Sequence, residues 1–211
     1  MFWKKKEKSP PEIRTKASAS GDQNYFLKIT LLGDGAVGKT NLRRNYLGQG
    51  FTQDHLMTIG ADFAATEKTF KFDDKIFQTT FQIWDLAGQA TFSNVRGMYY
   101  KGCFGSLMVF DRTRPSSFDN IENWLKEMNK NSGRGDIPTI LLGNKYDLVD
   151  TAEEVVPQED IDALLIKLNK NAETRGFNIQ YFDTSAITGL NVEPAFEALG
   201  ETILRWLKVI K

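Results

Sequence analysis

The chain has 211 residues, of which 41% are hydrophobic and 26% charged, so it is long enough to bury one sizeable core and short for two domains. It lacks an apolar run of the roughly 18 residues that cross a bilayer, and its single cysteine, Cys103, excludes an intramolecular disulfide and a cysteine-based zinc site. We therefore expect a soluble cytoplasmic protein in which Cys103 is a small buried hydrophobe.

The net charge of zero hides an uneven distribution along the chain. Residues 1–20 contain six basic and two acidic residues, whereas the remainder contains 21 basic and 25 acidic ones. A mildly acidic domain argues against nucleic-acid binding, which needs a positive face on the folded part. Because residues 1–24 lack apolar periodicity, we expect a disordered basic extension there and one domain over residues 25–211. The extension either only aids solubility or contacts an anionic membrane or a partner.

From residue 25 onward, short apolar strands alternate with amphipathic helices, which is typical of an α/β fold. The near-continuous apolar runs predict inner strands covered by helices on both faces. Two neighbouring segments around KFDD predict an antiparallel hairpin, in which Phe77, Thr79, Phe81 and Ile83 share one face. We expect six strands, over residues 26–32, 61–70, 75–84, 105–110, 138–143 and 180–185.

Helices are expected where apolar residues recur every three or four positions. The first would run from about Lys39 to Leu47 and end at Gly48, and the last would follow Asn191 as its N-cap. The apolar stripes, which we assign to the core, are Ile121, Trp124, Leu125 and Met128, then Ile161, Leu164, Leu165 and Leu168, and finally Val192, Phe196, Leu199, Ile203 and Leu207.

The stretch GDGAVGKT, residues 33–40, lies between the first predicted strand and the first predicted helix. It matches the pattern G-x-x-x-x-G-K-[ST], in which backbone N–H groups at the start of a helix wrap around phosphates. The ammonium of Lys39 would neutralise the outer phosphates, and the hydroxyl of Thr40 would bind Mg²⁺. We therefore predict a nucleoside triphosphate held by Gly33, Asp34, Gly35, Ala36, Val37, Gly38, Lys39, Thr40 and Asn41.

The base is indicated by LLGNKYD, which places Asn144, Lys145 and Asp147 at the end of an apolar strand. Ligands of open α/β sheets bind at such strand ends. The carboxylate of Asp147 can accept hydrogen bonds from N1–H and the exocyclic amino group of guanine, whereas adenine offers neither donor at that edge. The predicted ligand is therefore GTP or GDP, with Mg²⁺.

Together with DTSAITG at residues 183–189, these motifs resemble those of the Ras superfamily of small GTPases. The resemblance covers residues 26–207, and TIGADF, WDLAGQATF and GMYYKGCFGSLMVFD place it nearest to the Rab branch. It implies a P-loop small G domain with a mostly parallel six-stranded sheet, helices on both faces and one antiparallel edge hairpin. The loop that supports the base is matched by Ser185, Ala186 and Ile187.

The same resemblance implies roles for the residues of two switch segments. Phe51 would stack on guanine, and Thr58 would bind Mg²⁺ and the γ-phosphate. Asp85 would hold the metal through water, Gly88 would hydrogen-bond the γ-phosphate, and Gln89 would orient the attacking water. Lys39 and Thr58 would act with Gln89 in catalysis. The surface that faces effectors would contain Ile59, Phe63, Trp84 and Tyr99.

Some positions depart from the family pattern. Leu86 replaces the usual threonine, and Ala90 replaces the glutamate after the catalytic glutamine, which puts the standard exchange-factor interaction in doubt. These 211 residues have no C-terminal cysteine for prenylation, and Phe2 excludes N-myristoylation. Either a lipidated C-terminal tail is missing from these 211 residues, or the protein contacts membranes through residues 1–20, through a partner or not at all.

Three functions remain open from the sequence. The first is a GTPase switch with a GTPase-activating protein, an exchange factor and effectors that bind switch I and switch II. The second is a P-loop kinase or ATPase, which would leave NKYD and DTSA unexplained, and the third is a binding-only pseudo-GTPase that acts as a scaffold.

The switch prediction includes slow hydrolysis. No arginine or lysine lies between Gln49 and Glu67, and His55 stands three residues before Thr58. Because this segment has no arginine to stabilise the charge of the transition state, intrinsic hydrolysis of GTP is expected to be slow. If it were fast, Arg96 would be the first residue to suspect.

Overall fold

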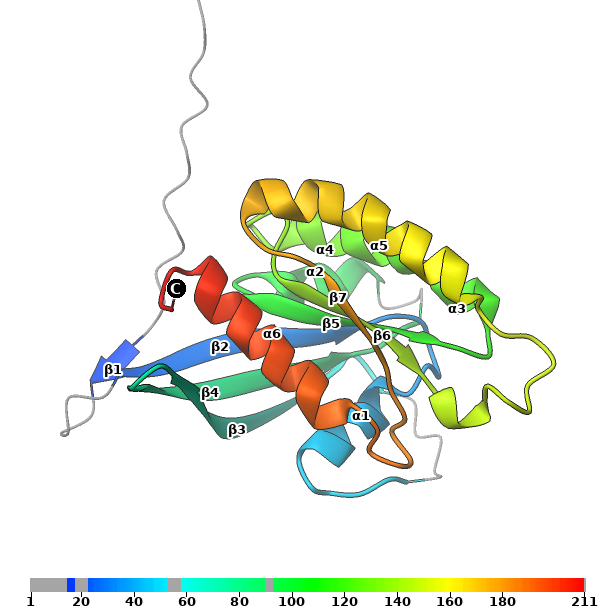
Figure 1. Ribbon diagram of the computed structural model, residues 1–211, viewed down its shortest axis with the longest axis horizontal. Coiled ribbons are helices and arrows are strands. Elements are labelled where there is room, and N and C mark those ends of the chain that lie inside the picture. The colour runs from blue at the N-terminus through cyan, green and yellow to red at the C-terminus, as the bar shows by residue number, and fades with distance from the viewer. Residues whose placement is uncertain (1–14, 18–22, 53–57, 90–92, 211) are drawn as a thin grey trace, which may run out of the picture.

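The structure, a computed structural model, describes residues 15–17, 23–52, 58–89 and 93–210. Within this part of the chain, a seven-stranded sheet carries helices on both faces (Figure 1). The strands lie in the order β3-β4-β2-β5-β6-β7, and β1 pairs with β2 beside this path. Their bounds are β1 Thr15–Ala17, β2 Gln23–Leu32, β3 Ala61–Phe72, β4 Lys75–Leu86, β5 Gly105–Asp111, β6 Thr139–Asn144 and β7 Gln180–Asp183.

The predicted sheet is confirmed in its six strands and in their directions. Strands β4, β2, β5, β6 and β7 are parallel to one another, whereas β3 is antiparallel to β4 at one edge. The hairpin turns tightly, since Phe72 pairs with Lys75, and Asp73 between them adopts a φ of 51°. The expected inward face of β4 is also found, with Thr79, Phe81 and Ile83 buried.

Helices connect these strands, and the predicted ones are α1, α4, α5 and α6. Helix α1 ends just before Gly48, whose φ of 69° only glycine adopts easily. Asn191 occupies the N-cap position of α6, as expected, but its side chain donates to the Asp183 carbonyl and makes no capping hydrogen bond to the helix. The helix bounds are α1 Lys39–Tyr46, α2 Ser93–Tyr100, α3 Pro115–Asp119, α4 Ile121–Asn131, η2 Tyr146–Leu148, α5 Gln158–Ala172, η3 Glu173–Arg175 and α6 Val192–Trp206.

The core has two layers, because successive strand residues point to opposite faces of the sheet. In β5, Leu107 and Val109 pack in the layer under α1 and α6, while Met108 and Phe110 pack under α2, α4 and α5. Figure 1 shows α6 crossing one face of the sheet, with α4 and α5 together on the other. The predicted stripe of α6 lies in the first layer, and Cys103 is buried in the second, as expected.

The start of the chain differs in part from the expected disordered extension over residues 1–24. Strand β1 pairs antiparallel with the first residues of β2, so that Thr15 lies opposite Tyr25. This pairing occupies the edge of β2 that β5 leaves open, since β5 joins β2 only from Ile29 onward. None of the described helices is both long and apolar enough to span a membrane.

Candidate functional site

The phosphate loop joins β2 to α1, and its glycines stand where the backbone makes close approaches. At Gly33 and Gly38 the φ angles are 134° and 98°, and a Cβ atom would overlap the carbonyl of Val109 or the side chain of Asn144. The loop closes around Lys39, whose Nζ donates to the carbonyls of Gly33 (2.8 Å) and Asp34 (2.7 Å). Burial lowers the pKa of Lys39 to about 8, against the opposing effect of Asp85 and Asp34.

Three predicted metal-site residues meet beside this loop. The Thr40 hydroxyl donates to the Asp85 carboxylate (2.5 Å) and lies 3.0 Å from the hydroxyl of Thr58, which is 3.3 Å from the same carboxylate. The second oxygen of Asp85 is buried and has no hydrogen-bond partner in the described part of the chain. Burial raises the pKa of Asp85. A set of hard oxygen donors with one unpaired carboxylate oxygen fits Mg²⁺.

The predicted base-binding segments are joined through Asn144. Its amide donates to the carbonyl of Val37 in the phosphate loop (2.8 Å), and its carbonyl oxygen accepts from the backbone N–H of Ala186 (3.2 Å). This buried side chain therefore holds the phosphate loop, the end of β6 and the loop after β7 together. Sequence analysis placed Asn144 among the nucleotide-binding residues, and the structure gives its polar atoms partners within the protein.

Around this junction, most of the remaining residues predicted to bind the base follow the carboxyl ends of β6 and β7, whereas Phe51 follows α1. Lys145 has a φ of 63° and forms a 2.7 Å ion pair with Asp111 at the end of β5. The Ser185 hydroxyl accepts from the backbone N–H of Thr188 and so shapes the loop after β7. The side chains of Phe51, Asp147 and Ile187 are exposed. Such a site would offer these apolar and acidic groups to a base.

The side chain of Asn41, like that of Asn144, has hydrogen-bond partners within the protein. Its side-chain amide donates to the carbonyl of Thr52 (3.1 Å) and accepts from the backbone N–H of the same residue (3.4 Å). This two-way bond fastens the chain next to Phe51 to helix α1. His55 and Ala90, about which the sequence raised expectations, lie outside the described residues.

The segment predicted to be switch II begins where β4 ends, against the phosphate loop. A Cβ atom at Gly88 would overlap the backbone of Asp34 and Gly35, so only glycine permits this approach. At Gly35, in contrast, a Cβ atom would meet only the Gln89 side chain, at 3.9 Å. The predicted catalytic glutamine therefore lies beside the phosphate loop.

A residue that the sequence did not point to lines the cavity at this place. Arg114, which precedes α3, donates to the carbonyl of Gly35 (2.7 Å). The cavity measures about 390 Å³ and is lined by Asp34, Gly35, Gly88, Arg114, Ser116 and Asn120. Because Arg114 lies 79 positions from Gly35 in the chain, no local pattern could have linked the two.

The predicted effector-facing residues form a contiguous aromatic row with an exposed neighbour. The rings of Phe63 and Trp84 lie 5.2 Å apart, and those of Trp84 and Tyr99 lie 5.6 Å apart. Phe63 is exposed, Trp84 is partly buried over the second core layer, and Ile59 is 84% exposed. Such a row is unusual on a free surface and fits a protein partner.

Comparisons with known proteins show which family the chain resembles. The model of the Ras family matches residues 28–205. The chain is 37% identical to Ras-related protein RABE1d of Arabidopsis thaliana, over 89% of this chain and 80% of that protein. It is 36% identical to Ras-related protein Rab7 of Pisum sativum, over 85% and 83%, and 38% identical to GTP-binding protein yptV5 of Volvox carteri, over 88% and 86%.

Proposed function

The chain belongs to the Ras family of small GTPases, and from that premise we propose that it is a Rab-like switch in membrane traffic, which binds Mg²⁺ with GTP or GDP and hydrolyses GTP slowly. Family membership implies guanine-nucleotide binding and hydrolysis. The observation that carries the proposal is the junction at Asn144, where the phosphate loop, the NKYD segment and the loop after β7 meet in one place.

Within this proposal, the phosphate loop receives the phosphates through its backbone N–H groups and through Lys39. Thr40 and Thr58, with Asp85 behind them, would hold Mg²⁺, which would supply positive charge to neutralise the negative charge that develops in hydrolysis. Asp147 selects guanine, and Phe51 and Ile187 supply apolar cover for the base.

Gln89 positions the attacking water, and Gly88 N–H meets the γ-phosphate. Both residues lie against Gly35, and that contact supports the assignment. Because the two switch segments would order around the γ-phosphate and relax after hydrolysis, the aromatic row at Phe63, Trp84 and Tyr99 would present a nucleotide-dependent surface to effectors.

We expect slow turnover because the sequence of switch I, between Gln49 and Glu67, contains no arginine. Arg96, which the sequence suggested as an alternative, is buried on Glu127, and its guanidinium is occupied there. Hydrolysis without an activating protein should therefore be on the order of 10⁻³ s⁻¹ or below. An activating protein that supplies an arginine would raise it by roughly 10³- to 10⁵-fold.

Single-turnover hydrolysis of GTP tests the proposal, with ATP binding measured alongside. We expect GTP and GDP to bind well and ATP poorly, and Gln89→Leu to slow hydrolysis further with little change in GDP affinity. Tight ATP binding would favour a kinase or ATPase, and GTP binding without hydrolysis would favour a pseudo-GTPase. A wild-type rate near 1 s⁻¹ without a partner would contradict the slow-switch proposal and direct attention to Arg114.

A further inference from the structure

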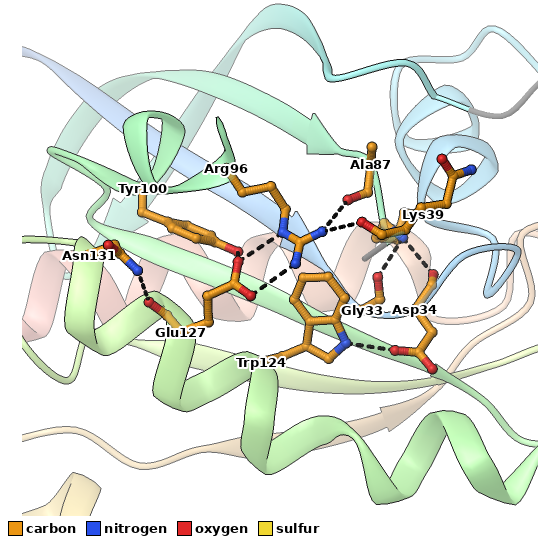
Figure 2. A network of polar contacts seen from close by, with 10 residues as sticks. Gly33, Asp34, Lys39, Ala87, Arg96, Tyr100, Trp124, Glu127 and Asn131 are labelled. Atoms are coloured by element: carbon orange, nitrogen blue, oxygen red, sulfur yellow. Dashed lines mark hydrogen bonds and ion pairs between the residues drawn. The ribbon is translucent and has the colours of Figure 1, made fainter. Parts of the chain in front are cut away.

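Arg96 of helix α2 is 3% exposed and contacts the backbone on both sides of Gly88 (Figure 2). Its Nη1 atom donates to the carbonyl of Gln89 (2.7 Å) and to the carbonyl of Ala87 (3.2 Å). One guanidinium group thus binds the peptide group before Gly88 and the peptide group after Gln89.

The other side of the same guanidinium is bound by helix α4. Its Nε and Nη2 atoms donate to the two carboxylate oxygens of Glu127, at 2.8 and 2.9 Å, and the Tyr100 hydroxyl donates to that carboxylate at 2.7 Å. The guanidinium also lies 4.4 Å from the ring centre of Trp124. Although burial opposes it, the bond from Arg96 helps to hold the pKa of Glu127 below its usual range.

These bonds constrain the direction of a backbone N–H. In a trans peptide group, the C=O and N–H point in opposite directions. With the Ala87 carbonyl directed at Arg96, the N–H of Gly88 is directed away from Arg96. Gly88 itself is pressed against Asp34 and Gly35, as its lack of room for a Cβ atom shows.

Helix α4 binds the phosphate loop as well. The Trp124 indole N–H donates to one carboxylate oxygen of Asp34 (2.8 Å), and the Asn120 amide donates to the other (2.9 Å). The backbone carbonyl of Asp34 accepts from Lys39. The same helix therefore fixes both the phosphate loop and, through Arg96, the start of switch II (Figure 2).

We propose that Arg96 is a positioning residue for GTP hydrolysis, which holds Gly88 and Gln89 at a fixed place relative to the phosphate loop through α4. The role rests on the proposed function, because it acts through the two residues that are assigned there to the γ-phosphate and the attacking water. Arginine suits this task, since its planar fork serves the carboxylate with one edge and the carbonyls with the other.

Arg96→Lys is the first test, because lysine keeps the charge but cannot bind Glu127 and both carbonyls at once. We expect single-turnover hydrolysis to fall by about 10- to 100-fold, the loss that small misplacements of catalytic groups produce. GDP affinity should stay within about twofold, since GDP lacks the γ-phosphate. The matched control is Arg175→Lys at an exposed ion pair, which should hydrolyse GTP as the wild type does.

A double-mutant cycle with Gln89 separates positioning from general loosening. If Arg96 acts through Gln89, Arg96→Lys should slow hydrolysis much less in the Gln89→Leu background than in the wild type. An equal fold-loss in both backgrounds would overturn the proposal, as would an unchanged rate for Arg96→Lys alone.

A second variant excludes misfolding as the cause. The triple change Arg96→Met, Glu127→Leu and Tyr100→Phe removes the whole network without leaving a buried charge unpaired, and such replacements are often neutral for stability. It should melt near the wild-type temperature and hydrolyse GTP as slowly as Arg96→Lys; a folded triple variant with wild-type hydrolysis would overturn the proposal.

A wild-type chain that binds GTP without hydrolysing it would overturn the proposed function too, whereas normal wild-type hydrolysis with unaffected Arg96 variants would overturn only this inference.

Discussion

Single side chains around the base site divide into those that hold the protein together and those that face outward. Asn144 is buried and its amide is bound on both sides, while Asp147, three residues later, is exposed. A change at Asn144 would therefore disturb the fold of the site. A change at Asp147 would test recognition of the base itself.

Asp147→Asn should weaken GTP and GDP by about 10- to 100-fold, which corresponds to one lost hydrogen bond to a charged group. The asparagine amide can donate to a carbonyl where the carboxylate could only accept, so binding should shift toward xanthine nucleotides. Competition of GTP and XTP for the purified protein measures both effects. Unchanged GTP affinity would mean that Asp147 does not contact the base.

At the proposed metal site, the close packing of Thr40, Thr58 and Asp85 leaves little room for a larger side chain. Thr40→Asn should lower the ratio of GTP to GDP affinity by about tenfold, because Mg²⁺ held at this site would neutralise the charge of the γ-phosphate, which only the triphosphate carries. Thr40→Ser keeps the hydroxyl and serves as the control. Equal weakening of both nucleotides, measured in equilibrium titrations with Mg²⁺, would contradict the assignment.

Sequence motifs identified the residue types of this site better than their partners. The spacing of Lys39 and Thr40 follows from local chain geometry, so a short pattern was enough to find them. Arg114 and the carboxylate contacts of Asp34 join segments about 80 to 90 positions apart, and only the packed fold brings them together. The bonds of Asn144 to Val37 and Ala186, 107 and 42 positions away, are long-range contacts too, whereas Asn41 binds Thr52 only 11 positions away.

At the scale of elements, alternation and apolar runs located the inner strands, and the stripes located the long helices. Helix α2 was missed because SNVRGMYY is short, contains Gly97 and has no apolar stripe of its own. Helix α3, with five residues, is too short for a helical period to be seen. The N-cap position of Asn191 was predicted correctly, but the sequence could not show that its amide binds β7 and leaves the helix without a side-chain cap.

Helix α6 contains a glycine that its packing requires. A Cβ atom at Gly200 would overlap the ring of Phe70 and lie 2.7 Å from that of Phe81. Gly200→Ala should gain about 1 kcal/mol in helix propensity but lose about 1–3 kcal/mol through overpacking, so the free energy of unfolding should fall.

Urea denaturation measures that loss, and Phe70→Leu in the Gly200→Ala background provides the control. Leucine lacks the outer ring atoms that the new methyl group would meet, so the double variant should be more stable than the sum of the two single changes predicts. A Gly200→Ala protein more stable than the wild type would show that α6 shifts freely on the sheet.

At the scale of the whole molecule, strand β1 and the phosphate loop lie at opposite ends of β2. Strand β1 pairs with β2 at residues 23–25, whereas the phosphate loop begins where β2 ends. The role of the extension in membrane contact remains a prediction, because composition alone suggested it.

Deletion of residues 1–20 should leave GDP affinity within about twofold while it removes a net charge of +4 and strand β1. In flotation assays, the chain without residues 1–20 should bind phosphatidylserine vesicles more weakly than the full chain does. Added salt should reduce the difference between the two chains. Deletion of residues 1–14 keeps β1 and removes most of the charge, so it separates the two causes. Equal flotation of all three chains would exclude the membrane role.

Strand β1, the first described element, and the end of α6, the last one, lie toward the same end of the sheet. Helix α6 starts after the loop that follows β7 and runs back over the sheet (Figure 1), and Ile210, beyond its last turn, is buried in the same core layer as Tyr25 near the start of β2. A short peptide joining these two ends would close the chain without crossing the nucleotide site. The molecule is thus suited to circular permutation, with new termini at the two-residue turn between β3 and β4, and the order of its motifs along the chain is separable from their arrangement in space.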